Sequence, residues 1–373
     1  MGVTKCQTII QLLEEIAPKR YAESWDNVGL LVGDGSQKVE RIMVCLDAPE
    51  WVIDEAIDSK VDMLVSHHPI IFSAIKRINT DNVLGRKIIK LIRNGISLYS
   101  MHTNYDVAKG GLNDLFAREM GFTSFENMET TYQERHYKLV VFVPKGYEAK
   151  VLDAMCTAGA GYIGKYSCCS FRSEGIGTFK PEEGTKPFIG EQGKLEQVEE
   201  YRVETIVPEK LLNKVKREMQ KSHPYEEVAF DLIPLDNAVE TVGLGRIAEL
   251  EQETTLRMYS ENIKKMLDAD WVKVAGDPNK LIKKVAFLNG SGNKFINTAR
   301  YAGADVLVTG DMQYHEIIDA VEMGLSIIDA GHFATEKIMI KAVTDYLRKK
   351  VELNRLKVEV MESKSNIEPL SII

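Results

Sequence analysis

RIMVCLDAPEWVIDEAIDSKVDMLVSHHPIIF, residues 41–72, contains a strand, a helix and a second strand in the order typical of parallel sheets. Two continuous apolar runs, residues 41–48 and 61–66, predict buried strands. The segment between them predicts a helix with Pro49 near its first turn. Because parallel strands need a crossover connection, the stretch predicts a parallel pair with a helix packed over the sheet.

The same alternation continues after residue 72 and returns late in the chain. Further strands are predicted at residues 96–101, 283–290, 304–311 and 325–331, and further helices at 81–95, 109–121, 293–303, 312–324 and 333–350. We therefore expect residues 1–126 and 243–373 to form one discontinuous α/β domain with a mostly parallel sheet.

The middle of the chain contains an internal repeat. YKLVVFVPKGYEAKVLDAM, from Tyr137, aligns without gaps with YRVETIVPEKLLNKVKREM, from Tyr201. Chance similarity of two strand–helix units is the alternative, but several identities in one register favour a repeat. Two such units predict a ferredoxin-like α+β domain, inserted as residues 127–242.

Composition excludes several classes of protein. The 373 residues are 44% hydrophobic and carry a formal net charge of −8, which disfavours broad binding to nucleic-acid backbones. No apolar run is long enough to span a membrane, and the N-terminus has no signal-peptide pattern. The five cysteines form no CxxC motif, so we expect a reduced, cytoplasmic protein.

Polar side chains follow three predicted strands at the points where those strands end. In open parallel sheets the carboxyl ends of the strands border the ligand crevice. We therefore expect one edge of the sheet to gather His67 and His68, His102 and Asp106, and His332 and Glu336.

The spacing within GHFATEK adds a second indication. His332 and Glu336 are four residues apart, so they share one face of a helix. The same face continues to Met339, Val343 and Tyr346, which are positions expected to pack on the sheet. A buried carboxylate is costly unless it is paired or bound to a cation. Metal binding would satisfy both side chains.

Less specific explanations exist for each residue alone. A single histidine at a strand end is usually structural, a His-x-x-x-Glu pair is usually on the surface, and Asp106 could cap a turn. Convergence at one sheet edge favours metal ligands. Adjacent side chains leaving a strand diverge, so His67 and His68 could serve two metals about 3.5–4 Å apart, with Glu336 bridging them.

Two further histidines have open roles. His315 lies four residues after Asp311, so it is either a proton shuttle or a helix residue bonded to Asp311. His102 is a hydrogen-bonding partner of a ligand, a proton carrier, or a ligand itself. His223, in SHPYEE, lies in a predicted turn that implies no site.

The sequence resembles the NIF-three-like dinuclear metal centre family, also known as the GTP cyclohydrolase 1 type 2 family. The motifs that carry the resemblance are ESWDNVGLLVGD, SHHPIIF, HTNYD, NGSG, TGDMQYH and GHFATEK. The inserted segment resembles the PII-like or CutA-like domain of the longer bacterial members.

This resemblance implies a pair of divalent metals, zinc or iron. One metal would be held by His67 and Asp106 and the other by His68 and His332, with Glu336 bridging. It also implies a homo-oligomer, a toroidal hexamer with the inserted domains capping the ring. Nitrogen and oxygen ligands suit zinc, iron, cobalt or manganese, so the ligand set does not choose among them.

The first functional hypothesis is a metal-dependent hydrolase that acts on GTP or a related nucleotide, with His102 or His315 moving protons. The alternative is a non-catalytic metal-binding regulatory or storage assembly. A third hypothesis, a structural ring that threads nucleic acid, is disfavoured by the net negative charge. A hydrolase needs an open metal position, whereas a storage or structural site is closed.

Overall fold

The computed structural model describes residues 3–237 and 241–371. The chain divides into two compact units. The first combines Met1–Tyr132 with Val242–Ile373, and the second is Gln133–Thr241. The second unit is therefore an insertion within the first in chain order.

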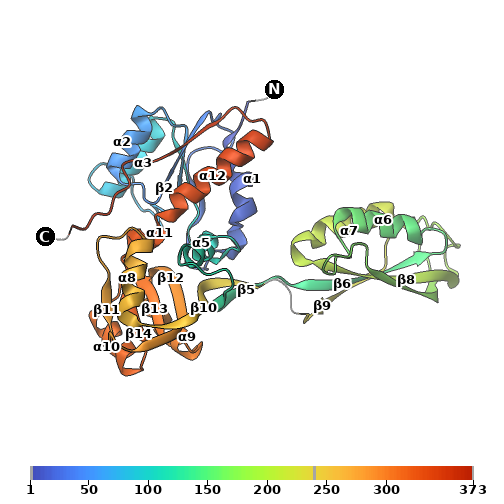
Figure 1. The fold of residues 1–373 in the computed structure, drawn as a ribbon. Coiled ribbons are helices and arrows are strands. Elements are labelled where there is room, and N and C mark those ends of the chain that lie inside the picture. The colour runs from blue at the N-terminus through green and yellow to red at the C-terminus, as the bar shows by residue number, and fades with distance from the viewer. Residues whose placement is uncertain (1–2, 238–240, 372–373) are drawn as a thin grey trace. The chain divides into compact units, whose positions relative to one another are not determined.

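The first sheet of the larger unit has five strands. Their order is β1(Gly29–Val32), β4(Ser97–Ser100), β3(Met63–Ser66), β2(Arg41–Cys45) and β15(Glu359–Glu362). Strands β15, β2, β3 and β4 are parallel to their neighbours, whereas β1 is antiparallel to β4. Apolar side chains of α1(Cys6–Ile16) and α12(Ile338–Leu353) cover one face, and those of α2(Glu50–Asp58) and α3(Val83–Arg93) cover the other (Figure 1).

The second sheet of the larger unit has six strands. Their order is β11(Lys273–Ala275), β14(Ser326–Asp329), β13(Val306–Gly310), β12(Leu281–Ser291), β10(Thr241–Thr255) and β5(Glu126–Gln133). Strands β12, β13 and β14 are parallel, and β10 and β11 flank them in antiparallel pairs. The apolar faces are covered by α5(Leu112–Glu119) with α8(Leu256–Met266) and by α9(Ile296–Tyr301) with α10(Tyr314–Glu322).

The predicted α/β class, with parallel strands covered by helices, is confirmed. The prediction of a single sheet is wrong, because the strands separate into two sheets. Both sheets have a parallel centre and an antiparallel edge, and the strands that periodicity did not reveal are the edge strands and β10, which lies next to the edge strand β5. Strand β5 pairs in the six-stranded sheet, so the predicted domain boundary after residue 126 falls at the first residue of that strand.

The inserted unit contains a four-stranded antiparallel sheet in the order β7(Ser170–Phe179), β8(Glu196–Pro208), β6(His136–Pro144) and β9(Phe230–Leu235). Helix α6(Glu148–Ala158) connects β6 to β7, and α7(Leu212–Ser222) follows β8. This connectivity is that of two split βαβ units. Val151 and Met155 of α6, and their repeat counterparts Val215 and Met219 of α7, are all fully buried in its core.

Short helical turns complete the fold: α4(Thr103–Val107), α11(His332–Glu336), η1(Lys19–Tyr21), η2(Glu209–Leu211) and η3(Asn293–Phe295). Within residues 3–237 and 241–371, no helix has the length and apolar character needed to cross a bilayer.

Candidate metal centre

The parallel strands of both sheets direct polar side chains to one place in the larger unit. Strand β3 ends at Ser66, and His67 and His68 follow directly. Strand β14 ends at Asp329, and α11 begins at His332. The carboxyl ends of parallel strands in both sheets therefore supply the site, as expected for open α/β sheets.

Helix α11 spans only His332–Glu336, and its first and last residues belong to the site. The i, i+4 spacing brings His332 Nε2 to 3.0 Å from Glu336 Oε2. The predicted continuous helix 333–350 is divided, because α12 starts separately at Ile338. The predicted stripe still packs inward, since Met339 and Val343 are fully buried.

All five residues that were predicted to bind metal lie in one cluster. His68 Nε2 is 3.1 Å from Glu336 Oε2 and 3.2 Å from His332 Nε2. On the other side of the carboxylate, His67 Nε2 is 3.8 Å from Glu336 Oε1 and 3.6 Å from Asp106 Oδ1. The two oxygens of Glu336 thus face different histidines.

Hydrogen bonds orient each imidazole so that its Nε2 faces the cluster. His67 Nδ1 lies 2.9 Å from the carbonyl oxygen of Met101, which can only accept, so this nitrogen carries the hydrogen. Carboxylates play the same part for the other two rings: Asp47 for His68 at 2.9 Å, and Asp311 for His332 at 2.7 Å. Such partners fix the tautomer in which Nε2 can donate its lone pair to a metal.

Two buried atoms of the cluster have no hydrogen-bond partner within the described part of the chain, namely His67 Nε2 and Glu336 Oε2. The His68 and His332 nitrogens lie within ion-pair distance of Glu336 Oε2 but not in hydrogen-bonding geometry. Buried polar atoms without partners are rare and costly. A cation between these donors would satisfy them, so the side chains present fit a metal.

The charges of the cluster are consistent with a cation site. Burial lowers the pKa of His67 to about 3, so this ring is neutral at pH 7. Burial also opposes charge on His68 and His332, but their carboxylate neighbours outweigh it and raise the pKa of His68 to about 10 and of His332 to about 9. Burial raises the pKa of Glu336, yet the surrounding imidazoles hold it well below its usual value. The carboxylates that favour positive charge on His68 and His332 would also favour a divalent cation beside them.

Asp106 is buried behind the histidines, and burial raises its pKa to about 7. The side-chain amide of Asn289, at the end of β12, donates to Asp106 Oδ1 at 2.9 Å and to Glu336 Oε1 at 3.3 Å. Asn289 therefore positions both carboxylates from the six-stranded sheet. The motif NGSG indicates this residue, but its contacts could not be read from the sequence.

His102 lies beside the cluster, with its ring centroid 5.1 Å from that of His67 and 5.4 Å from that of His68. Its Nδ1 is 3.0 Å from Asp26 Oδ1. Burial raises the pKa of Asp26, but the hydrogen bonds from His102 and Thr103 outweigh it and lower the pKa to about 2. Nδ1 of His102 therefore donates to an ionised carboxylate, which leaves Nε2 able to accept a proton or bind a metal.

His315 is not brought into the cluster. It is exposed on α10, where its ring centroid lies 5.3 Å from that of Tyr314. Asp311, which could have bonded it, lies instead against His332. Of the two histidines that were predicted to carry protons, the structure places only His102 next to the proposed ligands.

Two cavities border the cluster, and His332 lines both. The first, of about 420 Å³, extends from Asp106 and Glu336 to Trp25 and Lys294. The second, of about 760 Å³, extends from His68 past a group of aromatic and basic side chains: Trp51, Phe72, Trp271, Lys87 and Lys273. The cluster is thus reachable by a small molecule from two directions.

Glycine at position 290 makes room for the cluster. Gly290 has a φ of +64°, and a Cβ there would lie 2.5 Å from Glu336 Oε1. Gly290→Ala should therefore displace the carboxylate and remove most bound metal. It should also lower the free energy of unfolding by roughly 1–2 kcal/mol, because the left-handed conformation disfavours alanine. Metal analysis and denaturant unfolding measure the two effects separately.

Gly95→Ala is a matched control. Gly95 has the same φ of +64°, but a Cβ there would meet no atom within 4 Å. We expect a similar loss of stability with full metal content. Full metal content in Gly290→Ala as well would contradict the role given to the Glu336 carboxylate.

Together, the fold and the site define an α/β protein in which two sheets meet at a candidate metal centre. The chain belongs to the Duf34/NIF3 (NGG1p interacting factor 3) family, since the model of that family matches residues 4–369. The resemblance on which the sequence analysis relied is thereby confirmed.

Similar proteins cover the whole chain. It is 45% identical over 367 residues to a Bacillus subtilis protein and 46% identical over 373 residues to a Halalkalibacterium halodurans protein, both named GTP cyclohydrolase 1 type 2 homolog. These alignments cover 98% and 100% of both chains, respectively. A crystal structure of a Bacillus cereus protein related to NIF3 is 44% identical, with a TM-score of 0.90 and full coverage of both chains.

Proposed function

We propose that this protein is a metal-dependent hydrolase with a dinuclear centre. The observation that carries the proposal is a pair of donor groups that share His68. The donor atoms of His67, His68 and His102 lie within 4.8 Å of one another, and so do those of His68, His332 and Glu336. Two adjacent groups of this kind fit two metal ions better than one.

The ligand assignment follows the two sides of Glu336. His68 and His332 face Oε2 and would hold one ion, while His67, which faces Oε1, and Asp106, which lies 3.6 Å from His67 Nε2, would hold the other. Glu336 would bridge them. Imidazole and carboxylate ligands suit zinc or iron.

When bound, two divalent ions would act as Lewis acids and lower the pKa of water to near neutrality. The chain's own side chains supply the remaining functions. Asp26 holds His102 in the tautomer whose Nε2 accepts a proton, which suits a general base beside the centre. Asp47 and Asp311 keep His68 and His332 oriented.

We propose GTP or a related nucleotide as the substrate. Each cavity next to the cluster combines an aromatic side chain with a lysine, Trp25 with Lys294 in one and Trp271 with Lys87 in the other. Aromatic faces stack on purine rings, and lysine attracts phosphate. The relatives' name, GTP cyclohydrolase 1 type 2 homolog, points to the same substrate.

The proposal includes a homohexamer, the toroidal assembly that the family resemblance implies, with the inserted unit as a PII-like or CutA-like module. Helices α9 and α10 give a candidate contact surface between chains. Tyr301 is 88% exposed and Tyr314 is 74% exposed on these helices. Large exposed aromatic side chains are typical of interfaces.

Turnover tests the function directly. Metal-analysed protein is incubated with a panel of nucleotides led by GTP, with Glu336→Ala beside it, and products are separated by chromatography. Product formed only by the natural sequence would support a metal-dependent hydrolase. Bound metal without product from any nucleotide would favour the alternative, a non-catalytic regulatory or storage assembly.

A further inference from the structure

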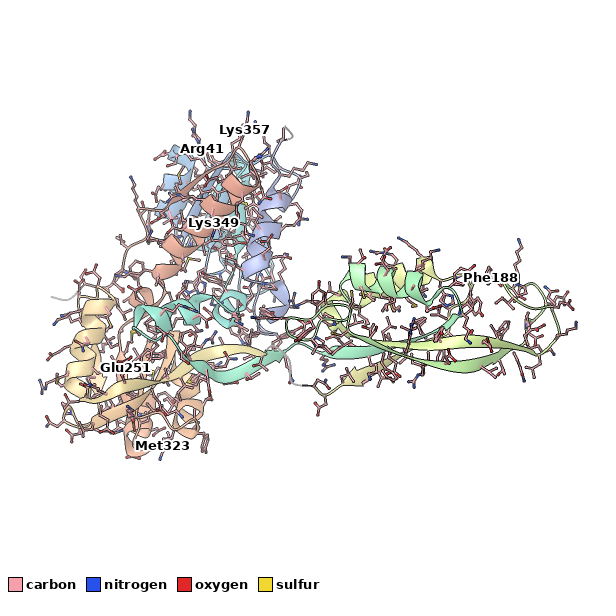
Figure 2. The ribbon with its side chains drawn as sticks, turned by 45° about the vertical axis from the view of Figure 1, so that its right-hand side comes forward. Arg41, Phe188, Glu251, Met323, Lys349 and Lys357 are labelled. Carbon is pink, nitrogen blue, oxygen red and sulfur yellow. The ribbon has the colours of Figure 1, made fainter. Side chains whose placement is uncertain are left out.

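The inserted unit contains a cavity of its own, far in sequence from the metal ligands. Its volume is about 380 Å³, which is within the range of small-molecule sites. Four aromatic side chains line it: Phe142, Phe179, Phe188 and Tyr225. Figure 2 labels Phe188, which belongs to the loop between β7 and β8.

A buried carboxylate lies in the wall of this cavity. Glu200 of β8 is only 8% exposed. Within the part of the chain that the structure describes, its carboxylate accepts one hydrogen bond, from Tyr225 Oη at 3.1 Å. On the neighbouring strand β7, a Cβ at Gly177 would lie 2.2 Å from Glu200 Oε2. A glycine in β7 thus leaves the space that the carboxylate occupies.

The buried Glu200 carboxylate would be stabilised by a positively charged partner. Acidic side chains are almost never this buried unless they are paired. Within the described residues, Glu200 forms no ion pair, and the charged residues that line the cavity are Glu200, Glu226 and Glu227. The wall therefore carries negative charge and aromatic faces but no basic side chain.

The aromatic walls are held in place by His223. Its Nε2 lies 3.0 Å from the carbonyl oxygen of Phe142, and its Nδ1 accepts from the backbone N–H of Tyr225 at 3.1 Å. Burial lowers the pKa of His223, which keeps the ring in the neutral form that these two bonds require. SHPYEE, predicted as a turn without a site, thus forms part of the cavity wall.

We propose that this cavity binds a small organic ammonium ion with an apolar body. Aromatic faces attract cations, and the attraction strengthens when water is excluded. Glu200 supplies the opposite charge, and the aromatic rings supply contacts for the apolar body. A metal ion fits less well, because these three glutamates do not form a group of three donors within 4.8 Å in the part of the chain that the structure describes. Anions such as free nucleotides are repelled by the same glutamates.

Three phenyl compounds of similar size and different charge test the charge requirement. Phenethylamine is cationic, 2-phenylethanol is neutral and phenylacetate is anionic. Binding to the full chain is measured by isothermal titration calorimetry after chelator treatment, so that an amine cannot coordinate a metal. We expect phenethylamine to bind about tenfold or more tightly than 2-phenylethanol, and phenylacetate not to bind. Equal affinities for the first two, or no binding of phenethylamine at millimolar concentration, would overturn the proposal.

Glu200→Gln tests the residue, because glutamine keeps the shape and an acceptor for Tyr225. It should weaken phenethylamine binding by about tenfold or more and abolish the preference over the alcohol. Glu199→Gln is the control, since adjacent strand residues point to opposite faces and the Glu199 side chain is 71% exposed. Phe188→Leu removes an aromatic face but no charge, so it should also weaken phenethylamine binding. It provides the test of the cavity if Glu200→Gln does not fold. Unchanged phenethylamine binding in Glu200→Gln, or equal losses of binding in Glu200→Gln and Glu199→Gln, would show that the Glu200 carboxylate does not bind the ammonium group.

Discussion

Glu336→Ala is expected to remove most of the metal from the centre while the chain still folds. The carboxylate of Glu336 faces His67 with one oxygen and His68 and His332 with the other. Loss of a partner that only orients a metal ligand costs about 10–100-fold in metal affinity, so loss of a shared ligand should cost at least as much. We expect bound metal to fall below about a tenth of that in the natural sequence.

The fold should survive because the histidines can give up their protons. Asp47 and Glu336 together raise the pKa of His68, and Glu336 and Asp311 together raise that of His332, so loss of Glu336 removes part of what favours charge on both rings. Circular dichroism and the elution volume of the variant should match those of the natural protein. Glu336→Gln, which keeps the shape and removes the charge, separates loss of a ligand from loss of packing.

Glu352→Ala is the matched control, because Glu352 is exposed on the neighbouring helix α12. Its metal content should equal that of the natural sequence. Stoichiometric metal in purified Glu336→Ala would show that the carboxylate does not bridge, and the ligand set would then have to be built from the histidines and Asp106 alone.

The clustering of the proposed ligands could be predicted because it depends on local pattern. Strand ends are visible as the ends of apolar runs, and His67 and His68 follow one directly. The His332–Glu336 pairing depends only on helical spacing, and the two side chains meet at 3.0 Å. Periodicity of 2 and 3.6 residues carries this information without knowledge of the tertiary fold.

The residues that orient the ligands could not be predicted, because they come from elsewhere in the chain. Asp47 follows β2 and Asp26 lies before β1, yet each bonds a histidine on another element. Asn289 reaches Asp106 across 183 residues of sequence. A carboxylate just after a parallel strand, as at Asp47, is a usable signal, but nothing local indicates which imidazole it contacts.

The division into two sheets has the same explanation. Apolar runs show which segments are buried strands but not which strands pair. Strands β1, β11 and β15 have only three or four residues each and lie at sheet edges. The antiparallel pairing of β10 with β12 therefore had no sequence signal strong enough to separate the second sheet from the first.

The last prediction separates the two histidines that could carry protons. His102→Gln should lower the turnover number of the metal-loaded protein on its substrate by about 10²–10⁴-fold, the usual contribution of a general acid or base. Its Nδ1 is held by ionised Asp26, and its ring centroid lies 5.1 Å from that of His67 and 5.4 Å from that of His68. Glutamine can keep the hydrogen bond to Asp26 but cannot accept a proton at neutral pH.

His315→Gln is the comparison, and we expect its turnover to stay within about twofold of the natural sequence, as for surface substitutions away from a site. The two variants differ in location, since His315 is exposed on α10 and His102 borders the cluster. Metal content decides how a loss in His102→Gln is interpreted. Full metal with low turnover identifies a proton carrier, whereas loss of metal makes His102 a ligand in the group with His67 and His68. A large loss in His315→Gln alone would instead require that α10 approach the centre during catalysis, against the placement of Asp311 beside His332.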